Sequence, residues 1–436
     1  MRRAGSAFAA LLSANGLAMA GTSMSMLALP WLVLSATGSA MDAGLVAFAE
    51  MLPYVLVQAL GGPFVDRWDK RRVGILTDII AAIAMGAAAL WALSSGGTSR
   101  GLGLSLLLAL MAIVGASRGA GSVAKRVLIP KAAAPIALPL ERASGLYEGV
   151  NRVATLLGGP LAGLLMAASS AGAVLALDAA SFGASALILA LGMPGEIGRS
   201  GEFGEPGLKE GTEAAERPSS YFAELVEGFV FLGRDRLLFA IGILLVVTNL
   251  LDQAYAAVLM PLWMKTELNS PLALGMVVGI FGAGAVAGNG LMTWLAPRLP
   301  RRLPFALGFL VGGAPRFLIL AFASSLGPVV FVALVAGMGA GGINPALGAV
   351  EFERVPARLQ ARVLGALGSL AWAGIPLGGL AGGALAGAVG LRGSLAGFGF
   401  VYLLATLAPF VFPVWRQMER KSGIESDEMR GTMTTR

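Results

Sequence analysis

The chain has 436 residues, of which 56% are hydrophobic and only 13% are charged, a charged share about half that of an ordinary soluble domain. It contains no cysteine and no histidine, which excludes disulfides, thiolate metal sites, cysteine nucleophiles and an imidazole proton relay. The net charge of +7 would suggest nucleic-acid binding in a soluble protein, but this composition predicts that lipid surrounds most of the chain.

Apolar stretches of about 20 residues, the length that crosses the hydrocarbon core of a bilayer, recur along the chain between short polar breaks. The first stretch follows Arg3 and continues to Leu34, which is too long for the core of a signal peptide, so we expect an uncleaved first span. The pattern predicts twelve spans, at 9–34, 43–62, 73–94, 102–124, 143–168, 171–192, 237–262, 272–296, 303–323, 326–350, 361–388 and 392–414.

The 32 Lys and Arg residues predict the orientation of these spans. If the N-terminus is cytoplasmic, nearly all of them fall in cytoplasmic segments, and the opposite side receives Arg100, Lys265 and Arg392. Cytoplasmic loops of membrane proteins carry such an excess of positive charge. We therefore expect a multi-pass protein of a bacterial-type inner (plasma) membrane with both termini in the cytoplasm, whose basic charge needs no nucleic-acid partner.

Residues 193–220 are glycine-rich and acidic and show no apolar period, which is typical of a flexible cytoplasmic linker. The linker divides the chain into an N-terminal six-helix bundle at 1–192 and a C-terminal six-helix bundle at 221–416. The polar residues at 417–436 predict a disordered cytoplasmic tail.

The two halves repeat each other weakly. The first span ends in LALPWL and the seventh in VLMPLW, and the basic pair Arg71-Arg72 recurs as Arg301-Arg302. Gly159-Pro160 in the fifth span has a counterpart in Ile375-Pro376 of the eleventh. Parallel six-span repeats are the mark of one large transporter architecture.

Residues 61–73 read GGPFVDRWDKRRV, which resembles the loop 2–3 motif of the major facilitator superfamily, although Asp69 stands where many members carry glycine. Further matches are LLGGPLAGLL at 156–165, LDAASFGASAL at 177–187 and GINPALGAVEFERVPARLQARVLGAL at 342–367. Together they look like the drug:proton antiporter branch that includes macrolide-efflux and enterobactin-exporter proteins. The resemblance implies an all-α polytopic membrane protein with twelve transmembrane helices in two pseudo-symmetric six-helix bundles.

The resemblance also implies a conformational gate. In the family, the loop 2–3 motif latches the cytoplasmic face, and the segment Gly159-Pro160-x-x-Gly163 resembles the antiporter motif of the fifth span. The alternative for the second motif is ordinary packing of small residues between membrane helices. The candidate gate residues are Gly62, Asp66, Arg67, Arg71, Arg72, Asp78, Gly159, Pro160, Gly163 and Asp178.

Charges within the spans are the candidates for the transport site, because a charge in a bilayer is costly and usually functional. Asp252 precedes Pro261 by nine residues, which places it about 13 Å from the outer end of the seventh span. This is near the midplane, beside the polar residues Asn249, Gln253 and Tyr255. We expect a coupling or substrate role for Asp252, the alternative being a structural pair with an arginine.

Four other candidates lie in the N-terminal half. Glu50, in the outer part of the second span, is expected to bind a proton or a cationic substrate, or else to line a solvated cavity. Arg118 lies in the fourth span, where related drug antiporters carry an arginine linked to proton transfer. Glu148 and Arg152 stand one helical turn apart in the fifth span and are expected to neutralise each other.

Two letter patterns are rejected. Gly115-Ala-Ser117-Arg-Gly119 fits a nucleophile elbow, but no strand precedes it and no histidine exists to activate the serine. The segment 337–342 matches a dinucleotide-binding pattern by letters alone. We therefore predict that the protein is not an enzyme and needs no cofactor or metal.

The sequence predicts a secondary active transporter that exports a hydrophobic or amphipathic, drug- or macrolide-like small molecule by alternating access. Proton coupling is expected, with Asp252 and Glu50 alternating between proton and substrate. The expected partners are the small-molecule substrate, protons and the lipid bilayer, and the protein is expected to act as a monomer. The alternatives are a lysophospholipid or siderophore carrier of the same fold and, more remotely, a non-transporting membrane receptor.

Overall fold

The fold is seen in a computed structural model, which describes residues 2–61, 68–95, 102–195, 221–295, 298–356 and 359–419. The helices of the N-terminal half are α1 (Arg2–Thr37), α2 (Ala40–Leu60), α4 (Lys70–Ser95), α5 (Leu102–Ala133), η1 (Ala134–Ile136), α6 (Leu140–Ala168) and α7 (Ala171–Gly192).

The helices of the C-terminal half are more often interrupted. They are α9 (Tyr221–Arg234), α10 (Arg236–Ala254), η2 (Tyr255–Leu259), α11 (Met260–Trp263), η3 (Met264–Leu268), α12 (Pro271–Leu295), α13 (Arg302–Gly312), α14 (Ala314–Phe322), α15 (Leu326–Gly341), α16 (Ile343–Arg354), α17 (Gln360–Ala373), α18 (Ile375–Val411) and η5 (Pro413–Met418).

The helical segments confirm the predicted twelve-span, all-α fold. Eleven stretches in the described part of the chain are long and apolar enough to cross a membrane, and the last of them, Arg362–Val411, has 50 residues and holds two spans. These two spans meet at Gly390, whose φ of 77° lies where only glycine fits without strain. The turn falls between 388 and 392, where the sequence predicts the break.

The seventh span differs from its predicted end at 262. The helical chain runs on to Leu268 through two π turns, Tyr255–Leu259 and Met264–Leu268, which flank Pro261. Proline has no backbone N–H, so an α-helix cannot continue regularly through it, and a π turn absorbs the mismatch. The prediction ended the span at 262, one residue after the proline, whereas the helical chain continues to Leu268.

The predicted internal repeat is visible in two equivalent contacts. Arg71, at the start of α4, donates from Nη2 to the carbonyl oxygen of Ala190 at 2.5 Å, in the last turn of α7. Arg302, at the start of α13, donates in the same way to the carbonyl oxygen of Phe410 at 3.3 Å, near the end of α18. In each half, a basic residue of the third span thus caps the free carbonyl end of the sixth.

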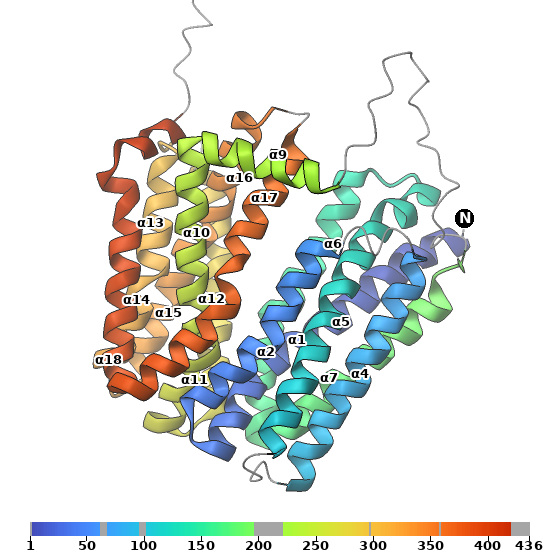
Figure 1. Ribbon diagram of the computed structural model, residues 1–436, viewed down its shortest axis with the longest axis horizontal. Coiled ribbons are helices and arrows are strands. Elements are labelled where there is room, and N and C mark those ends of the chain that lie inside the picture. Colours follow the sequence, from blue (N-terminus) through green and yellow to red (C-terminus); the bar gives the residue numbers. More distant parts are fainter. Residues whose placement is uncertain are drawn as a thin grey trace, which may run out of the picture.

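Helices α1 to α7 form one bundle and α10 to α18 the other, here called the N bundle and the C bundle (Figure 1). Their ribbons separate toward the end that carries α9 and converge at the opposite end. We call these the linker end and the contact end. The loop predicted as the linker is described only at 193–195, and the predicted tail only at 417–419.

Glycines make the closest contacts between the bundles. A Cβ atom on Gly44 of α2 would lie 2.3 Å from the carbonyl oxygen of Gly379 in α18. A Cβ atom on Gly163 of α6 would lie 2.7 Å from Cα of Gly275 in α12. Small residues allow membrane helices to approach backbone to backbone, which gives close van der Waals packing.

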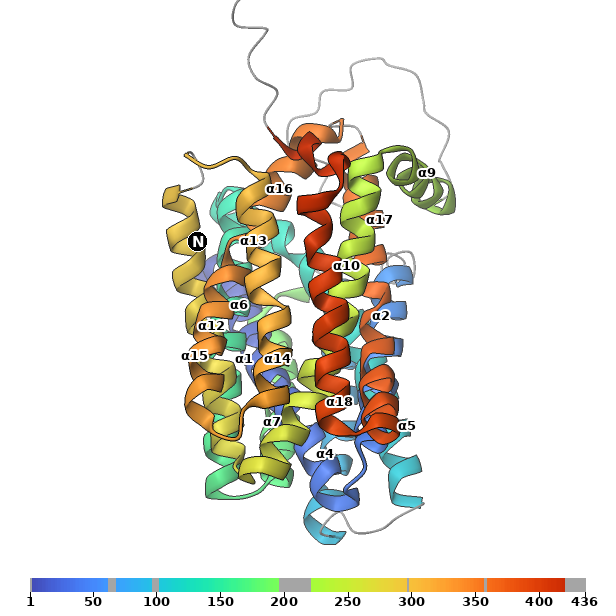
Figure 2. The same ribbon diagram turned by 90° about the vertical axis from the view of Figure 1, so that its left-hand side faces the viewer.

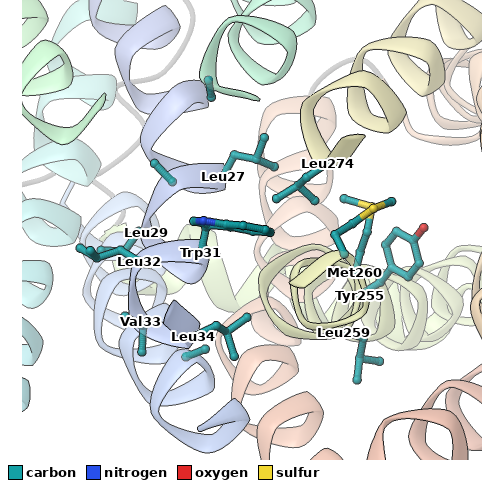
Figure 3. Close-up of a cluster of buried hydrophobic side chains, with 14 of the residues drawn as sticks. Leu27, Leu29, Trp31, Leu32, Val33, Leu34, Tyr255, Leu259, Met260 and Leu274 are labelled. Atoms are coloured by element: carbon teal, nitrogen blue, oxygen red, sulfur yellow. The ribbon is translucent and has the colours of Figure 1, made fainter. Parts of the chain in front are cut away.

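Apolar side chains fill the space beside these glycine contacts. Figure 3 shows Leu27 and Trp31 of α1 extending toward Leu274 and Met260 of the C bundle, all within one buried cluster. Lys265 places its ammonium 5.1 Å from the centre of the Trp31 ring, a cation–π distance. The contact end is therefore sealed by side chains from both bundles.

Helix α9 lies across the linker end, roughly perpendicular to the spans (Figures 1 and 2). Glu227 forms an ion pair with Arg362 of α17, and Gly228 lets the two helices approach closely. No helix outside the twelve spans is predicted from the sequence at 221–234. At the other edge of the C bundle, η5 includes the first two residues of the predicted tail, and Arg354 donates to Gln417 at 2.6 Å.

Candidate functional site

The predicted gate loop is only partly described. Gly62, Asp66 and Arg67 lie outside the described residues. Asp69, which departs from the family pattern, accepts from the backbone N–H groups of Arg71 at 2.9 Å and Arg72 at 3.2 Å through Oδ1. A carboxylate before the first turn of a helix satisfies N–H groups that have no partner within the helix. The departure therefore caps α4.

The equivalent loop of the C bundle carries a different contact. Arg301 directs both terminal nitrogens at the carboxylate of Glu353, near the end of α16. Arg301 lies before the first residue of its span, and these hydrogen bonds raise its pKa further above the ordinary value. The pair joins α13 and α16 at the linker end.

Asp78, a candidate gate residue, belongs to a buried polar cluster inside the N bundle. Lys125 of α5 donates to Asp78 Oδ1 at 2.8 Å, and Ser185 of α7 donates to Oδ2 at 2.6 Å. Each of these side chains is nearly inaccessible. The cluster ties three helices together with its charges balanced, so Asp78 is placed as a structural group within one bundle.

Glu50 and Arg118, predicted separately, form one ion pair between α2 and α5. Only 6% of the Glu50 side chain and 12% of the Arg118 side chain are accessible. The guanidinium also lies 5.3 Å from the centre of the Tyr54 ring, which stacks on Trp372 of the C bundle at 6.0 Å. The pair is thus linked by aromatic contact to the opposite bundle.

Asp252 is the centre of a second pair, inside the C bundle. Arg316 of α14 donates to Asp252 Oδ1 at 2.6 Å, and the hydroxyl of Tyr402 in α18 lies 3.4 Å from Oδ2. The guanidinium is placed 5.1 Å from the Tyr255 ring centre and 4.9 Å from that of Phe281. Although Arg316 is 12% accessible, the Asp252 side chain remains 39% accessible.

Breaks in the helices place these groups. Gly313 separates α13 from α14 and so turns Arg316, three residues later, toward α10. The Tyr402 ring occupies the space beside Gly313, because a Cβ atom there would lie 1.7 Å from the ring. On α10, the regular helix ends directly after Asp252 and Gln253, where the π turn begins at Tyr255. Discontinuous spans with bound charges are typical of transporter sites.

A cavity of about 260 Å³ lies between the bundles near the contact end. Its walls are mostly apolar, and it is lined by Ser23, Met26, Leu27, Leu29, Pro30, Ala43, Val46, Ala47, Glu50, Met51, Thr155, Gly159, Gln253, Ala256, Ala257, Met260 and Val278. Glu50 is the only charged residue among these lining residues. The structure therefore brings together the candidates Glu50, Gln253 and Gly159, while Asp252 pairs with Arg316 inside the C bundle.

The remaining candidates have other surroundings. Asn249 donates to the carbonyl oxygen of Ala371 at 2.9 Å and so joins α10 to α17. Gly159 and Pro160 pack on Val278 and Gly279 of α12, which places the predicted antiporter motif at the interface between the bundles. This position fits either a gate or the packing alternative.

The expected pair of Glu148 and Arg152 is wrong. Glu148 pairs with Arg126 of α5 at 3.2 Å, with 50% and 68% of their side chains accessible, and Arg152 is exposed. The spacing of one helical turn places both residues on the exposed surface of α6, but Glu148 pairs with the cation of the neighbouring helix α5.

Three residues around the two ion pairs, Arg316, Tyr402 and Tyr54, are not among the site candidates predicted from the sequence. Arg316 had one usable signal, an arginine within a span, but its partner could not be identified. Tyr402 and Tyr54 carry no charge and gave no signal. In the described part of the chain, no group of three or more Asp or Glu side chains is arranged to hold a metal ion.

Comparisons with known proteins agree with this architecture. The chain matches the Major Facilitator Superfamily over residues 11–251 and 242–431. It is 31% identical over 425 residues, 97% of each chain, to a protein of Mycobacterium tuberculosis (strain ATCC 25618 / H37Rv) named multidrug efflux pump Tap. A protein of the same name from Mycolicibacterium fortuitum is 29% identical over 404 residues, which are 92% of this chain and 95% of that protein.

Solved structures show the same fold. The nucleoside transporter NupG superimposes with a TM-score of 0.72 at 13% identity, covering 93% of this chain and 99% of that one. A bacterial homolog of the human lysosomal transporter Spinster, in an inward-facing and occupied conformation, gives 0.67 at 14% identity, with 95% and 98% covered. With its twelve spans, repeated halves and full-length match, the chain belongs to the Major Facilitator Superfamily.

Proposed function

We propose that the protein exports hydrophobic or amphipathic, drug-like small molecules in exchange for protons, by alternating access. The observation that carries this proposal is the largely apolar cavity between the bundles, in which Glu50 is the charged lining residue. Such a cavity suits an apolar molecule that bears a cationic group. The relatives that match the full length of the chain are named multidrug efflux pumps, which supports export of this class of substrate.

The proposed orientation places the linker end in the cytoplasm of a bacterial cell. Lys70, Arg71 and Arg126 lie toward that end in the N bundle, and Arg301 and Arg302 in the C bundle. Lys265 and Arg392 lie toward the contact end. The positive-inside rule favours this assignment, which puts both termini in the cytoplasm. The bundles are then closed on the outer side and separated on the inner side.

Protons are proposed to compete with the salt bridges at Glu50 and Asp252. A carboxylate that takes up a proton loses its charge and, with it, the attraction to the paired guanidinium. The guanidinium does not give up its proton and therefore stays charged. Protonation therefore breaks the pair and frees a helix contact. Since Asp252 is more accessible than Glu50, we assign proton exchange first to Asp252 and substrate contact to Glu50.

The experiment uses inside-out vesicles that contain the purified protein and a fluorescent hydrophobic cation outside. Acidifying the lumen is expected to drive the cation inward, because protons then leave as substrate enters. Asp252→Asn is expected to retain binding of the cation and to lose the response to the gradient. Glu148→Gln is the matched control, because that carboxylate is exposed and pairs weakly at the surface.

Two results would contradict the proposal. Transport that is indifferent to the pH gradient would remove proton coupling, and unaltered coupling in Asp252→Asn would remove that residue from it. Competition by lysophospholipids or siderophores, but not by hydrophobic cations, would favour the alternative carrier of the same fold. Size-exclusion chromatography with light scattering tests the proposed monomer.

Alternating access requires the glycine contacts at the contact end to separate. Gly44→Val places side-chain atoms where the carbonyl of Gly379 now lies, so closure at this end is expected to be blocked. The chain contains no cysteine, so pairs of spin labels can be introduced without removing native thiols. Labels across the contact end should move apart in Gly44→Val, and an unchanged distance distribution would contradict this role.

A further inference from the structure

The proposal concerns Asp178, which the pairs described above leave unused. It lies near the middle of α7, and its side chain is completely inaccessible. Its Oδ2 atom has no hydrogen-bond partner among the described residues, although Asp78, the other buried aspartate of the N bundle, is fully paired. A buried carboxylate with an oxygen that has no hydrogen-bond partner is expensive, and most so inside a membrane.

One hydroxyl of the same helix serves the carboxyl group of Asp178. Ser181 can donate to the carbonyl oxygen of Asp178 at 2.7 Å or to its Oδ1 atom at 3.3 Å. A hydroxyl has one hydrogen, so these two acceptors share a single donor. The Oδ2 atom receives no hydrogen bond among the described residues. Protonation of the carboxyl group removes the charge that this single shared donor leaves uncompensated.

Charged groups around α7 are paired elsewhere. The charged groups that act on Asp178 are Arg118 and Glu50, which bind each other. Lys125 of α5 binds Asp78 of α4, two turns along α7 from Asp178. The described side chains of α1 include no charged residue. Among the described residues, therefore, no Lys or Arg forms an ion pair with Asp178.

Helix α1 is built closely around the carboxyl group. A Cβ atom on Gly21 would lie 2.4 Å from Asp178 Oδ1 and 2.1 Å from Ser181 Oγ, so glycine is required there. The same stretch of α1 lines the central cavity through Ser23, Met26 and Leu27. One segment of α1, about two turns long, thus contacts the Asp178 carboxyl group on one face and lines the cavity on the other.

We infer that Asp178 is a proton-binding site inside the N bundle, coupled to the central cavity through residues 21–27 of α1. This inference rests on the proposed proton coupling and adds a site to it. Asp178 holds its proton while α1 is packed as described. Release requires a hydrogen-bond donor, from water or a side chain, to reach Oδ2, which has none in the described packing. A shift of α1 as substrate enters or leaves the cavity causes that change.

Infrared spectroscopy of the purified protein in lipid nanodiscs tests the protonation without transport. At neutral pH, we expect a carbonyl band of a buried carboxylic acid that is lost in Asp178→Asn. Asp78→Asn is the matched control, because Asp78 is also buried but forms an ion pair with Lys125, so its substitution should leave the band in place. A band that is unchanged in Asp178→Asn would overturn the inference.

Two further measurements complete the test. The first applies if Asp178→Asn does not fold, and the second tests whether Asp178 responds to substrate binding. Ser181→Ala keeps the carboxyl group but removes the hydroxyl that lies 3.3 Å from Oδ1, so the acid band should shift, and an unshifted band would contradict the assigned contact. Addition of a hydrophobic cation to weakly buffered protein should release a proton in the wild type and none in Asp178→Asn. Equal release would overturn the coupling through α1. Failure of gradient-driven export alone, with the infrared result intact, would count against the proposed function and not against this site.

Discussion

The two buried ion pairs resemble each other in composition and differ in construction. In each bundle a carboxylate meets an arginine that also lies over a tyrosine, Tyr54 in the N bundle and Tyr255 in the C bundle. The N-bundle pair joins α2 and α5, each a single α-helix, although α2 contains Pro53 three residues after Glu50, and its carboxylate is 6% accessible. The C-bundle pair sits where α10 enters a π turn and α13 gives way to α14, and its carboxylate is 39% accessible.

The accessible carboxylate, Asp252, lies two residues before the end of α10 and its π turn, whereas the inaccessible one, Glu50, lies inside α2. A carboxylate that water can reach can gain or lose a proton without the fold opening first. A carboxylate held between continuous helices exchanges only when the helices move. The proposed division of labour, with Asp252 for the proton and Glu50 for the substrate, follows from this contrast.

The largest expected effect is on stability, in the N bundle. Glu50→Gln leaves Arg118 buried without an anion, and a guanidinium cannot shed its charge, so we expect a loss of about 3–5 kcal/mol in unfolding free energy. Asp252→Asn should cost less, because its site is more accessible and two aromatic rings still contact Arg316. Thermal unfolding in detergent, followed by tryptophan fluorescence, measures both.

Double variants test the cause of that difference. Glu50→Gln combined with Arg118→Gln should recover most of the lost stability, because no uncompensated charge remains. Equal losses in the two single carboxylate variants would show that accessibility does not distinguish the pairs.

The sequence predicted the spans and the candidate charged residues better than it predicted which residues pair with each other. Span number, the break near Gly390 and the candidate status of Glu50, Arg118 and Asp252 all followed from hydropathy and from the cost of a charge in lipid. Partners could not be predicted, because a span's rotation and tilt are determined by packing against helices far away in sequence. Glu148 illustrates this: local spacing favoured Arg152, and the fold supplied Arg126.

The second expected effect concerns the break beside the C-bundle pair. Gly313→Ala introduces a methyl group into the space of the Tyr402 ring, and overpacking of this kind costs about 1–3 kcal/mol. The displaced ring can no longer reach Asp252, so gradient-driven transport should fall together with stability. In a Tyr402→Ala background, Gly313→Ala should cause no further loss of stability, whereas in Tyr402→Phe, which keeps the ring, it should cost as much as in the wild type. A smaller loss in Tyr402→Phe would show that the hydroxyl and not the ring is the obstacle.

A smaller effect is expected from Tyr402→Phe alone. Its hydroxyl lies 3.4 Å from Asp252, a long contact, and hydrogen bonds within membrane proteins average about 0.6 kcal/mol. Transport should therefore change by no more than about threefold, since 1.4 kcal/mol corresponds to a factor of ten. The initial rate of uptake into vesicles measures it. A loss as large as that of Asp252→Asn would make Tyr402 part of the proton site.

The smallest effect is expected from the exposed ion pair between α5 and α6. Glu148 and Arg126 also form a carboxylate–arginine pair, but half or more of each side chain is accessible, and such pairs contribute about 0–1 kcal/mol. Glu148→Gln should leave both unfolding temperature and gradient-driven transport near the wild-type values. Raising the salt concentration should weaken this pair and leave the two buried pairs unaffected, because surface charges are screened and buried ones are not. A transport defect in Glu148→Gln would mean that the position of the charge along α6 matters more than its burial, and accessibility would then no longer rank the three pairs.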